Sequence, residues 1–354
     1  MDHGIRGRWI LAMALGLIVA SVATAETADS PDLVSFSFNE PSSDNYVPNE
    51  LPEHVQDTIF APNDAWFPLI RFVGWGVNSS IEVDAISYGH DADSNQFDAF
   101  FSVGLGSQGL PGTAVFNENP EDERYSDIYA SDKGGDNTLI YDGDGSTAEP
   151  LGVLENASTN VDAIDMRASS SKGLIYWSVS QETAENENPY MAAVASGADI
   201  FVGQEDDGYS TALPLTPYAQ AWALGLTGTD DLDALVVIDP DADGLFDPTT
   251  DTIYFSLVDG STSLVASGVA PFQGAGPADI FMVGGGLVTP IVAATALKLG
   301  LEATDELDGL DLAVREEILI ALPEPDAVWQ LVCGITLLLS LASSRRHRVS
   351  GSLH

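Results

Sequence analysis

A short phrase recurs four times along the chain at a nearly constant interval. It consists of an aliphatic residue, an aspartate, a small residue and a second aliphatic residue, at Val83–Ile86, Val161–Ile164, Leu232–Leu235 and Leu307–Leu310. The aspartates of successive copies are 78, 71 and 75 residues apart. A fixed period of this length is typical of repeat architectures, in which each unit is one supersecondary structure packed on its neighbours. The repeat therefore predicts a body assembled from four similar units.

Two further phrases recur with the same period as the first. One is an aromatic or aliphatic residue, a small residue and another apolar residue, at Phe101–Val103, Trp177–Val179, Phe255–Leu257 and Ile320–Leu322, with an extra copy at Phe36–Phe38. The other is Asp-Ile-aromatic, at Asp127–Tyr129, Asp199–Phe201 and Asp279–Phe281, with a looser member at Asp57–Phe60. Taking this last phrase as the start of each unit gives boundaries near 57–126, 127–198, 199–278 and 279–322.

The units have the sequence character of β-structure. Their apolar runs are short, rich in β-branched and aromatic residues, and bounded by Gly, Pro, Asp, Asn and Ser. Apolar and polar residues alternate in 33–38 and 252–257. The segment 290–301 is the one stretch that resembles a helix, but its counterpart 218–226 is too short and aromatic for one, so we expect strands in both. Each unit then has four strands.

We therefore expect an all-β fold, and first a four-bladed β-propeller-like ring, because repeated four-stranded sheets around an axis leave only short edges. The extra strand at 33–38 would close the ring by pairing with the last unit. However, the last unit has a fourth strand of its own at 317–322. The alternative for the extra strand is therefore that it caps the edge of a sheet. One or two β-sandwiches built from paired units are the alternative.

The N-terminus has the pattern of a secretory signal peptide. Arg6 and Arg8 precede an apolar run over 9–20, and Ala23 and Ala25 form the small-residue pattern that signal peptidase needs. We expect residues 1–25 to be removed, and residues 26–322 to form an extracytoplasmic β-repeat domain.

The C-terminus carries a second targeting pattern. Pro323-Glu324-Pro325 precedes a mostly apolar run at 327–342, and a basic cluster of Arg345, Arg346 and Arg348 follows. As a helix rising about 1.5 Å per residue, this run is slightly short of the roughly 30 Å hydrocarbon core. The basic cluster predicts a single transmembrane helix with its positive end in the cytoplasm.

The order of these three parts resembles the PEP-CTERM sorting signal of exported bacterial surface proteins, and the resemblance covers residues 323–348. It implies that an exosortase recognises the tail and removes it during export. Because such tails commonly accompany exopolysaccharide systems, it also implies association with exopolysaccharide or with another surface protein. The alternative is an ordinary anchor that stays in place. Either interpretation places the body outside the cytoplasm, at the cell envelope, at the cell surface or in the extracellular matrix.

Charge and cysteine content restrict the partners and the chemistry. The chain has 12 basic and 54 acidic residues, a net charge of −42. Such a surface repels nucleic acid and favours solubility and divalent cations. The single cysteine, Cys333, lies in the apolar tail, so the body has no disulfide.

One loop has the spacing of a calcium site. Residues 239–247 fit D-x-D-x-D-G-x-x-D, with Asp239, Asp241, Asp243 and Asp247 as carboxylate ligands and Leu245 as a carbonyl ligand. Alternate carboxylates on a loop point to one centre, and oxygen is the ligand that Ca2+ prefers. The pattern resembles the calcium loops in hairpins of integrin-type propeller blades. An ordinary Asp-Gly turn in an aspartate-rich chain is the alternative.

The first unit carries a weaker version of this loop at the same turn. Its candidate ligands are Asp91, Asp93, Asn95 and Asp98, but the spacing is off by one residue and the glycine is missing. At Asp142–Gly145 only two carboxylates have the required spacing.

No known catalytic motif occurs in the body, whose only histidines are His54 and His90. We therefore expect a non-enzymatic protein with an acidic structural or adhesive repeat domain stabilised by calcium. The alternatives are a carbohydrate- or protein-binding propeller and an extracellular polysaccharide hydrolase that uses an Asp/Glu pair. We expect the tryptophans near strands to pack in the core, namely Trp66, Trp75, Trp177 and Trp222.

Overall fold

The structure is a computed structural model that divides into two units, residues 29–313 and the two chain ends, 1–28 with 314–354. All described residues belong to the first unit: 34–37, 58–61, 67–71, 75–77, 83–88, 99–118, 123–144, 149–153, 159–167, 174–185, 196–204, 217–266, 272–299 and 301–312. The signal peptide 1–25, the strand expected at 317–322 and the sorting signal 323–348 lie outside them. Among the described helices, none combines the length and the apolar character that crossing a membrane requires.

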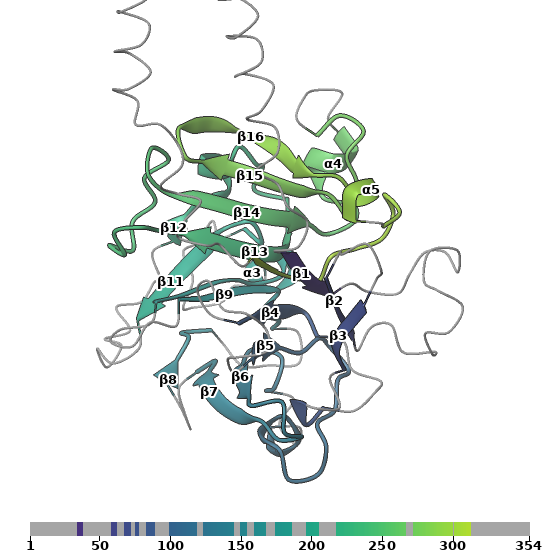
Figure 1. The fold of residues 1–354 in the computed structure, drawn as a ribbon. Helices are drawn as coiled ribbons and strands as arrows, with labels where there is room; N and C mark the ends of the chain where they lie inside the picture. Colours follow the sequence, from purple (N-terminus) through teal and green to yellow (C-terminus); the bar gives the residue numbers. More distant parts are fainter. Residues whose placement is uncertain are drawn as a thin grey trace, which may run out of the picture. The chain divides into compact units, whose positions relative to one another are not determined.

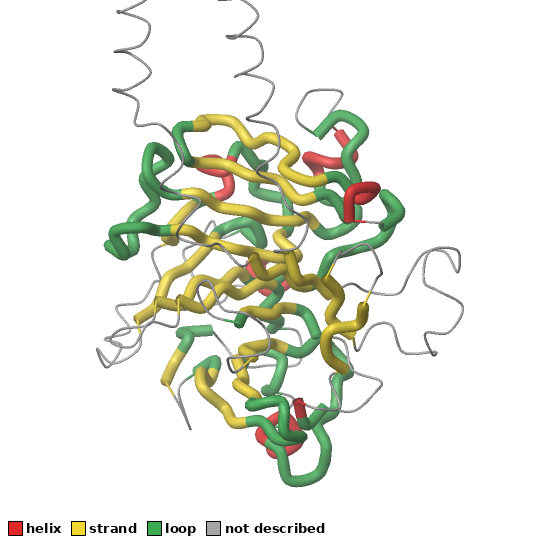
Figure 2. Tube along the Cα trace, in the orientation of Figure 1, coloured by secondary structure: helices red, strands yellow, loops and turns green. Residues whose placement is uncertain are grey.

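The predicted all-β class is confirmed: the described chain forms four sheets with few and short helices (Figures 1 and 2). Sheet I contains β4 (Ala85–Ser87), β5 (Ala99–Ser102), β6 (Ile128–Ser131), β7 (Thr138–Asp142) and β8 (Glu149–Pro150). Sheet II contains β9 (Ala163–Arg167), β10 (Leu174–Ser178), β11 (Ile200–Gln204) and β12 (Pro217–Ala219). Sheet III contains β13 (Leu232–Ile238), β14 (Thr252–Leu257), β15 (Ile280–Gly284) and β16 (Leu287–Ala294). Sheet IV has the order β17 (Gly309–Leu312), β1 (Val34–Ser37), β2 (Thr58–Ala61) and β3 (Phe67–Arg71).

Neighbouring strands in these sheets are antiparallel, apart from the parallel pair β7 and β8. The helical segments each span a turn or so: α2 (Ala114–Asn117), α3 (Gln181–Glu185), the 3-10 helix η6 (Ala221–Leu224), α4 (Thr262–Ala266) and α5 (Ala296–Leu299).

Each sheet starts at the aspartate-containing phrase, not at the Asp-Ile-aromatic phrase. The strand that contains or follows the first phrase is β4, β9, β13 or β17, and in sheets I to III the next two strands carry the other two phrases. The sheets are therefore out of phase by two strands with units that begin at residues 127, 199 and 279. A periodic sequence has no marked starting point, so the period alone does not fix which strands share a sheet.

Sheet IV joins the two ends of the body. Strand β1 pairs with β17 in the antiparallel register Val34↔Leu312 to Ser37↔Gly309. The predicted pairing of the N-terminal strand with the last unit is thus present. The sheet is completed by β2 and β3 from the N-terminal side.

The four strands that begin the sheets contact one another in cyclic order, β4 to β9, β9 to β13, β13 to β17 and β17 to β4. We call them the inner strands. Small residues permit this approach. Ala85 shares a buried cluster with Ile164, Ala163 with Leu235, and Ala234 with Leu310. At the fourth position stands Gly309, where a Cβ atom would lie 2.8 Å from Ile86 Cγ1 and 2.6 Å from Ser37 Oγ.

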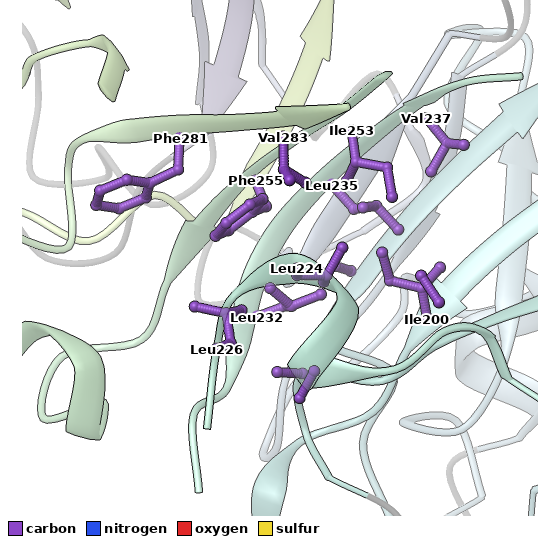
Figure 3. Close-up of a cluster of buried hydrophobic side chains, with 14 of the residues drawn as sticks. Ile200, Leu224, Leu226, Leu232, Leu235, Val237, Ile253, Phe255, Phe281 and Val283 are labelled. Carbon is purple, nitrogen blue, oxygen red and sulfur yellow. The ribbon is translucent and has the colours of Figure 1, made fainter. Parts of the chain in front are cut away.

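The largest buried cluster lies between sheets II and III (Figure 3). Its side chains from β13, β14 and β15 pack against Ile200 of β11 and against Leu224 and Leu226. Burying an aliphatic or aromatic side chain stabilises the fold by about 1.5–3 kcal/mol each. Without a disulfide, this burial is the principal source of the domain's stability.

The expectation of strands throughout 290–301 and 218–226 is wrong for the second part of each segment. Strand β16 ends at Ala294 and continues into α5, and β12 ends at Ala219 and continues into η6. Aspartates at the start of the preceding strands cause these turns. Asp279 Oδ1 accepts a hydrogen bond from Ala296 N at 2.6 Å, and Asp199 Oδ1 accepts one from Ala221 N at 2.8 Å. Capping of this kind satisfies a free backbone N–H and favours a helical turn.

The contact between Gly309 and Ile86 provides a test of the packing of sheet IV on sheet I. We expect Gly309→Val to lower the free energy of unfolding by about 1–3 kcal/mol, because added methyl groups would force apart a close-packed contact. Denaturant titration measures this change. The matched control is Gly228→Val, since a Cβ atom at Gly228 has no atom within 4 Å. Equal stability of the two variants would contradict the packing.

Candidate metal centre

The predicted calcium loop connects β13 with β14 and brings three of its carboxylates together. Asp239, at the end of β13, is buried, whereas Asp241 and Asp243 are exposed. One carboxylate oxygen of each lies within 4.8 Å of the others. The spacing suits a calcium ion, whose oxygen ligands lie about 2.3–2.6 Å from the metal and therefore up to about 5 Å apart.

Asp239 shapes the loop. Its Oδ1 accepts a hydrogen bond from Ala242 N at 2.8 Å, and its Oδ2 accepts bonds from Gly244 N at 3.3 Å and Tyr176 Oη at 2.8 Å. Ala242 and Gly244 both have left-handed backbone conformations, with φ of 54° and 70°. Glycine adopts this conformation without strain, while alanine needs the support of its surroundings. The buried carboxylate holds the reversal that places Asp241 and Asp243 beside it.

The electrostatics of the loop reflect this proximity. A side-chain hydrogen bond with Asp239, followed by the charges of Asp243, Asp239 and Asp251, raises the pKa of Asp241. Asp243 Oδ1 accepts a hydrogen bond from Leu245 N at 2.8 Å, while the Leu245 side chain is 69% exposed. A bound divalent cation would offset the repulsion among the three carboxylates.

Asp247 is not a member of the three-carboxylate group. Its Oδ1 accepts hydrogen bonds from Thr249 N at 2.8 Å and Thr249 Oγ1 at 2.7 Å, and these bonds lower its pKa. In this arrangement Asp247 caps the turn that leads into β14. Because Asp-x-Thr is also a capping sequence, the spacing of Asp247 fits both a ligand and a cap.

The loop is fastened to sheet II by tyrosines that the sequence did not single out. Tyr218 of β12 donates its hydroxyl to Asp251 Oδ2 at 2.9 Å, as Tyr176 of β10 does to Asp239. The rings of Tyr176 and Tyr218 lie 4.9 Å apart, and Phe246 of the loop lies 5.8 Å from Tyr218. A turn of sheet III is thus held by the neighbouring sheet. No local motif indicates such partners, because they come from a different sheet.

The aspartates of the Asp-Ile-aromatic phrase have a structural role. Asp127, like Asp199 and Asp279, stands before the third strand of its sheet and accepts a backbone N–H from beyond the fourth, here Gly143 N at 3.0 Å. Burial is the main reason that the pKa of Asp127 rises to about 8, although its hydrogen bonds from Gly143 and Tyr129 act in the opposite direction. These three carboxylates therefore connect the start of the third strand with the end of the fourth strand in their sheets.

The remaining predicted site residues have mixed outcomes. Asp91, Asp93, Asn95 and Asp98 lie outside the described residues, as do Ala23, Ala25 and the sorting-signal residues. The predicted core positions of Trp75 and Trp177 are confirmed, since both are at most 1% exposed. The prediction for Trp222 is wrong: it is 74% exposed, because it lies on η6 instead of a strand, and its Nε1 donates to Gln220 Oε1 at 2.8 Å. Trp66 is outside the described residues.

A second group of carboxylates, which the sequence pattern did not indicate, lies in the same part of the chain as β13 and β17. One oxygen each of Asp233, Glu306 and Asp308 lies within 4.8 Å of the others. The two aspartates belong to the first repeated phrase, in different units.

The chain matches no family model and no curated protein. Among solved structures, it is similar to an α-L-arabinofuranosidase from Fusarium graminearum in complex with an iminosugar inhibitor, at 10% identity and a TM-score of 0.26. That match covers 71% of this chain and 57% of the arabinofuranosidase. A second similar structure is Ycf48 bound to a D1 peptide, at 10% identity and a TM-score of 0.23, covering 67% of this chain and 76% of the other. At these TM-scores neither similarity carries an argument about function.

The tyrosine contacts give a test of how the loop is held. We expect Tyr218→Phe to lower the free energy of unfolding by about 1.5–3 kcal/mol, because it removes a hydrogen bond to the buried Asp251 carboxylate, whose Oδ2 keeps only Asp247 N as a donor within the described chain. Tyr88→Phe is the matched control, since Tyr88 Oη is buried and has no hydrogen-bond partner among the described residues. The control should be neutral or slightly stabilising. Urea titration measures both, and a Tyr218→Phe variant as stable as the control would show that this hydrogen bond contributes nothing.

Proposed function

We propose that this chain is an exported cell-envelope protein whose acidic β-repeat body is stabilised by calcium and has a structural or adhesive role without catalysis. The observation that carries the proposal is the grouping of Asp239, Asp241 and Asp243 within 4.8 Å on a turn that Asp239 itself shapes. A chain of net charge −42 has strong self-repulsion, which bound divalent cations reduce.

For the finer architecture, we propose that the four sheets are the blades of a four-bladed β-propeller. The proposal is supported by the cyclic contacts of the inner strands and by the pairing of β1 with β17, which joins the chain ends within one sheet. Small residues at equivalent positions of the inner strands also support it, since four strands around one axis leave little room for larger ones. Paired β-sandwiches would not need four equivalent close approaches.

Calcium binding to the loop is tested by thermal unfolding of recombinant residues 26–322 in Ca2+ and in EDTA. At a free Ca2+ concentration of about 100 times the dissociation constant, one bound ion adds roughly 2.7 kcal/mol to the free energy of unfolding. We therefore expect a rise in Tm of several degrees in Ca2+, and a smaller rise in an Asp241→Asn, Asp243→Asn variant.

The matched control for this variant is Asp132→Asn, Glu185→Gln, which removes the same number of exposed negative charges outside the loop. It should keep the full response to Ca2+. If the loop variant and the control respond equally, Asp241 and Asp243 are only part of an acidic turn, and the calcium assignment fails.

Export and sorting complete the proposal. Signal peptidase would cut after Ala25, and an exosortase would recognise Pro323-Glu324-Pro325 together with the apolar run and the basic cluster that follow. The sequence order of these parts is the support. The body would then be released at, or attached to, the cell surface, where exopolysaccharide or another surface protein is its proposed partner.

The sorting step is tested by expressing the full chain in a bacterium that carries an exosortase. We expect the mature protein to lose both its signal peptide and its C-terminal tail, which mass spectrometry of the intact protein would detect. Replacing Arg345, Arg346 and Arg348 with glutamine should leave the tail attached, because the basic cluster holds the apolar run in its orientation. A tail that stays on the unaltered chain would indicate a permanent anchor instead.

A carbohydrate- or protein-binding surface is the second candidate. The exposure of Trp222 favours it, because a tryptophan ring that is 74% exposed offers a platform for a sugar ring or an apolar side chain. Helix η6, which carries Trp222, contacts the edge strand β16, and Val288 of that strand is 82% exposed.

A further inference from the structure

The four aspartates of the first repeated phrase are buried at the ends of the inner strands. Asp84, Asp162 and Asp308 immediately precede β4, β9 and β17, and Asp233 is the second residue of β13. Each is between 6% and 9% exposed. Because the inner strands contact one another in cyclic order, the four equivalent carboxylates converge from four sheets. We call them, with Glu306, the axial cluster.

On one side of the axial cluster an amide donates hydrogen bonds to two of the carboxylates. Asn160 stands two residues before Asp162, and its Nδ2 donates to Asp84 Oδ2 at 2.5 Å and to Asp162 Oδ1 at 2.6 Å. A single side chain thus connects the inner ends of sheets I and II. Asn160 Oδ1 is buried and, within the described residues, has no hydrogen-bond partner.

The other side has a carboxylate where the first has this amide. Glu306 stands two residues before Asp308, the position that Asn160 has before Asp162. It places a third carboxylate beside Asp233 and Asp308, with one oxygen of each residue within 4.8 Å of the others. Three acceptors meet here, and a carboxylate has no proton of its own to share when ionised.

Asp233 lacks a hydrogen-bond donor inside this group. It is 8% exposed, and its Oδ2 has no hydrogen-bond partner in the part of the chain that the structure describes. Burial, and then the charges of Asp308, Glu306, Asp84 and Asp231, raise the pKa of Asp233. A buried carboxylate with no donor is unfavourable unless it is protonated or pairs with a cation. Asp233, whose Oδ2 lacks a partner, is the residue that lies beside the carboxylates of Glu306 and Asp308.

We propose that Asp233, Glu306 and Asp308 bind one divalent cation of the calcium class where the inner strands β13 and β17 meet. All three ligands offer oxygen, which selects hard cations over zinc or copper. The three oxygens lie within 4.8 Å of one another, and this falls within the roughly 5 Å that two Ca2+ ligands span. Asp84, Asp162 and Asp231 add negative charge around the ion.

Such an ion would connect sheet III with sheet IV. Asp233 belongs to β13, and Glu306 and Asp308 lead directly into β17, which pairs with β1. The site is independent of the loop 239–247, because it shares no ligand with it. The repeated phrase provides the reason for its position: each unit delivers one carboxylate to the same end of its inner strand.

The test counts calcium ions bound to the full chain, which is purified in a mild detergent, stripped with a chelator and then re-equilibrated with Ca2+. Native mass spectrometry and elemental analysis give the count for three variants. The first carries Asp241→Asn and Asp243→Asn, which removes the loop site. The second adds Asp233→Asn and Asp308→Asn to the first variant. The third instead adds Asp132→Asn and Glu185→Gln to the first variant, as a charge-matched control on exposed residues.

We expect one calcium ion in the first and third variants and none in the second. No ion in the first variant, or equal counts in the first and second, would overturn the proposal. The outcome for the loop is read separately, from the difference between the unaltered chain and the first variant. Failure of the loop site therefore does not imply failure of the axial site.

Thermal unfolding keeps the proposal testable if the carboxamides alter folding. In EDTA the second variant should melt no lower than the first, because neutral side chains remove the repulsion, while Ca2+ should raise the Tm of the first variant alone. If the second variant does not fold, Asp308→Asn by itself, on the background of the first variant, replaces it. A rise of at least tenfold in the calcium Kd supports the site, and an unchanged Kd overturns it.

Discussion

The close approach of the four inner strands is the constraint on which the described fold depends. It requires a residue without a large side chain at one position of each strand, and the chain has Ala85, Ala163, Ala234 and Gly309 there. Each small residue leaves room for an aliphatic side chain of the neighbouring inner strand, so the pattern is both steric and cyclic. The packing of the inner strands therefore explains why small and large residues alternate in the repeated phrase.

Aspartate serves three separate purposes in this chain, which explains part of its abundance. Before the third strands, Asp127, Asp199 and Asp279 join strand ends by accepting backbone N–H groups. In the turn after β13, Asp239 shapes a loop that gathers further carboxylates. At the inner strands, Asp233 and its equivalents are buried side by side, and Asp233 Oδ2 has no hydrogen-bond partner among the described residues. Composition alone treats all of these as surface charge, whereas burial and hydrogen bonding separate them.

Sequence reasoning identified the period, the β class and the pairing of the N-terminal strand with the last unit, because these follow from local pattern and from the count of repeats. It missed the phase of the sheets, since a repeat has no intrinsic beginning. It also missed the short helices α5 and η6, whose turns depend on Asp279 and Asp199 from an earlier strand. For the loop, the spacing predicted Asp239, Asp241 and Asp243 as neighbours. The supporting tyrosines and the Asp233 group depend on contacts between sheets, which no local spacing encodes.

The pairing of β1 with β17 has a consequence for the order in which the body assembles. Val34 and Leu312 are partners although nearly the whole described chain lies between them. During synthesis the N-terminal segment appears first, and the edge of β1 that belongs to β17 stays unpaired until the last inner strand has been made. Contacts of such long sequence separation form slowly, because the loop between them must be closed first. We therefore expect sheet IV to form slowly, and until it forms the two ends of the body present open strand edges to other chains.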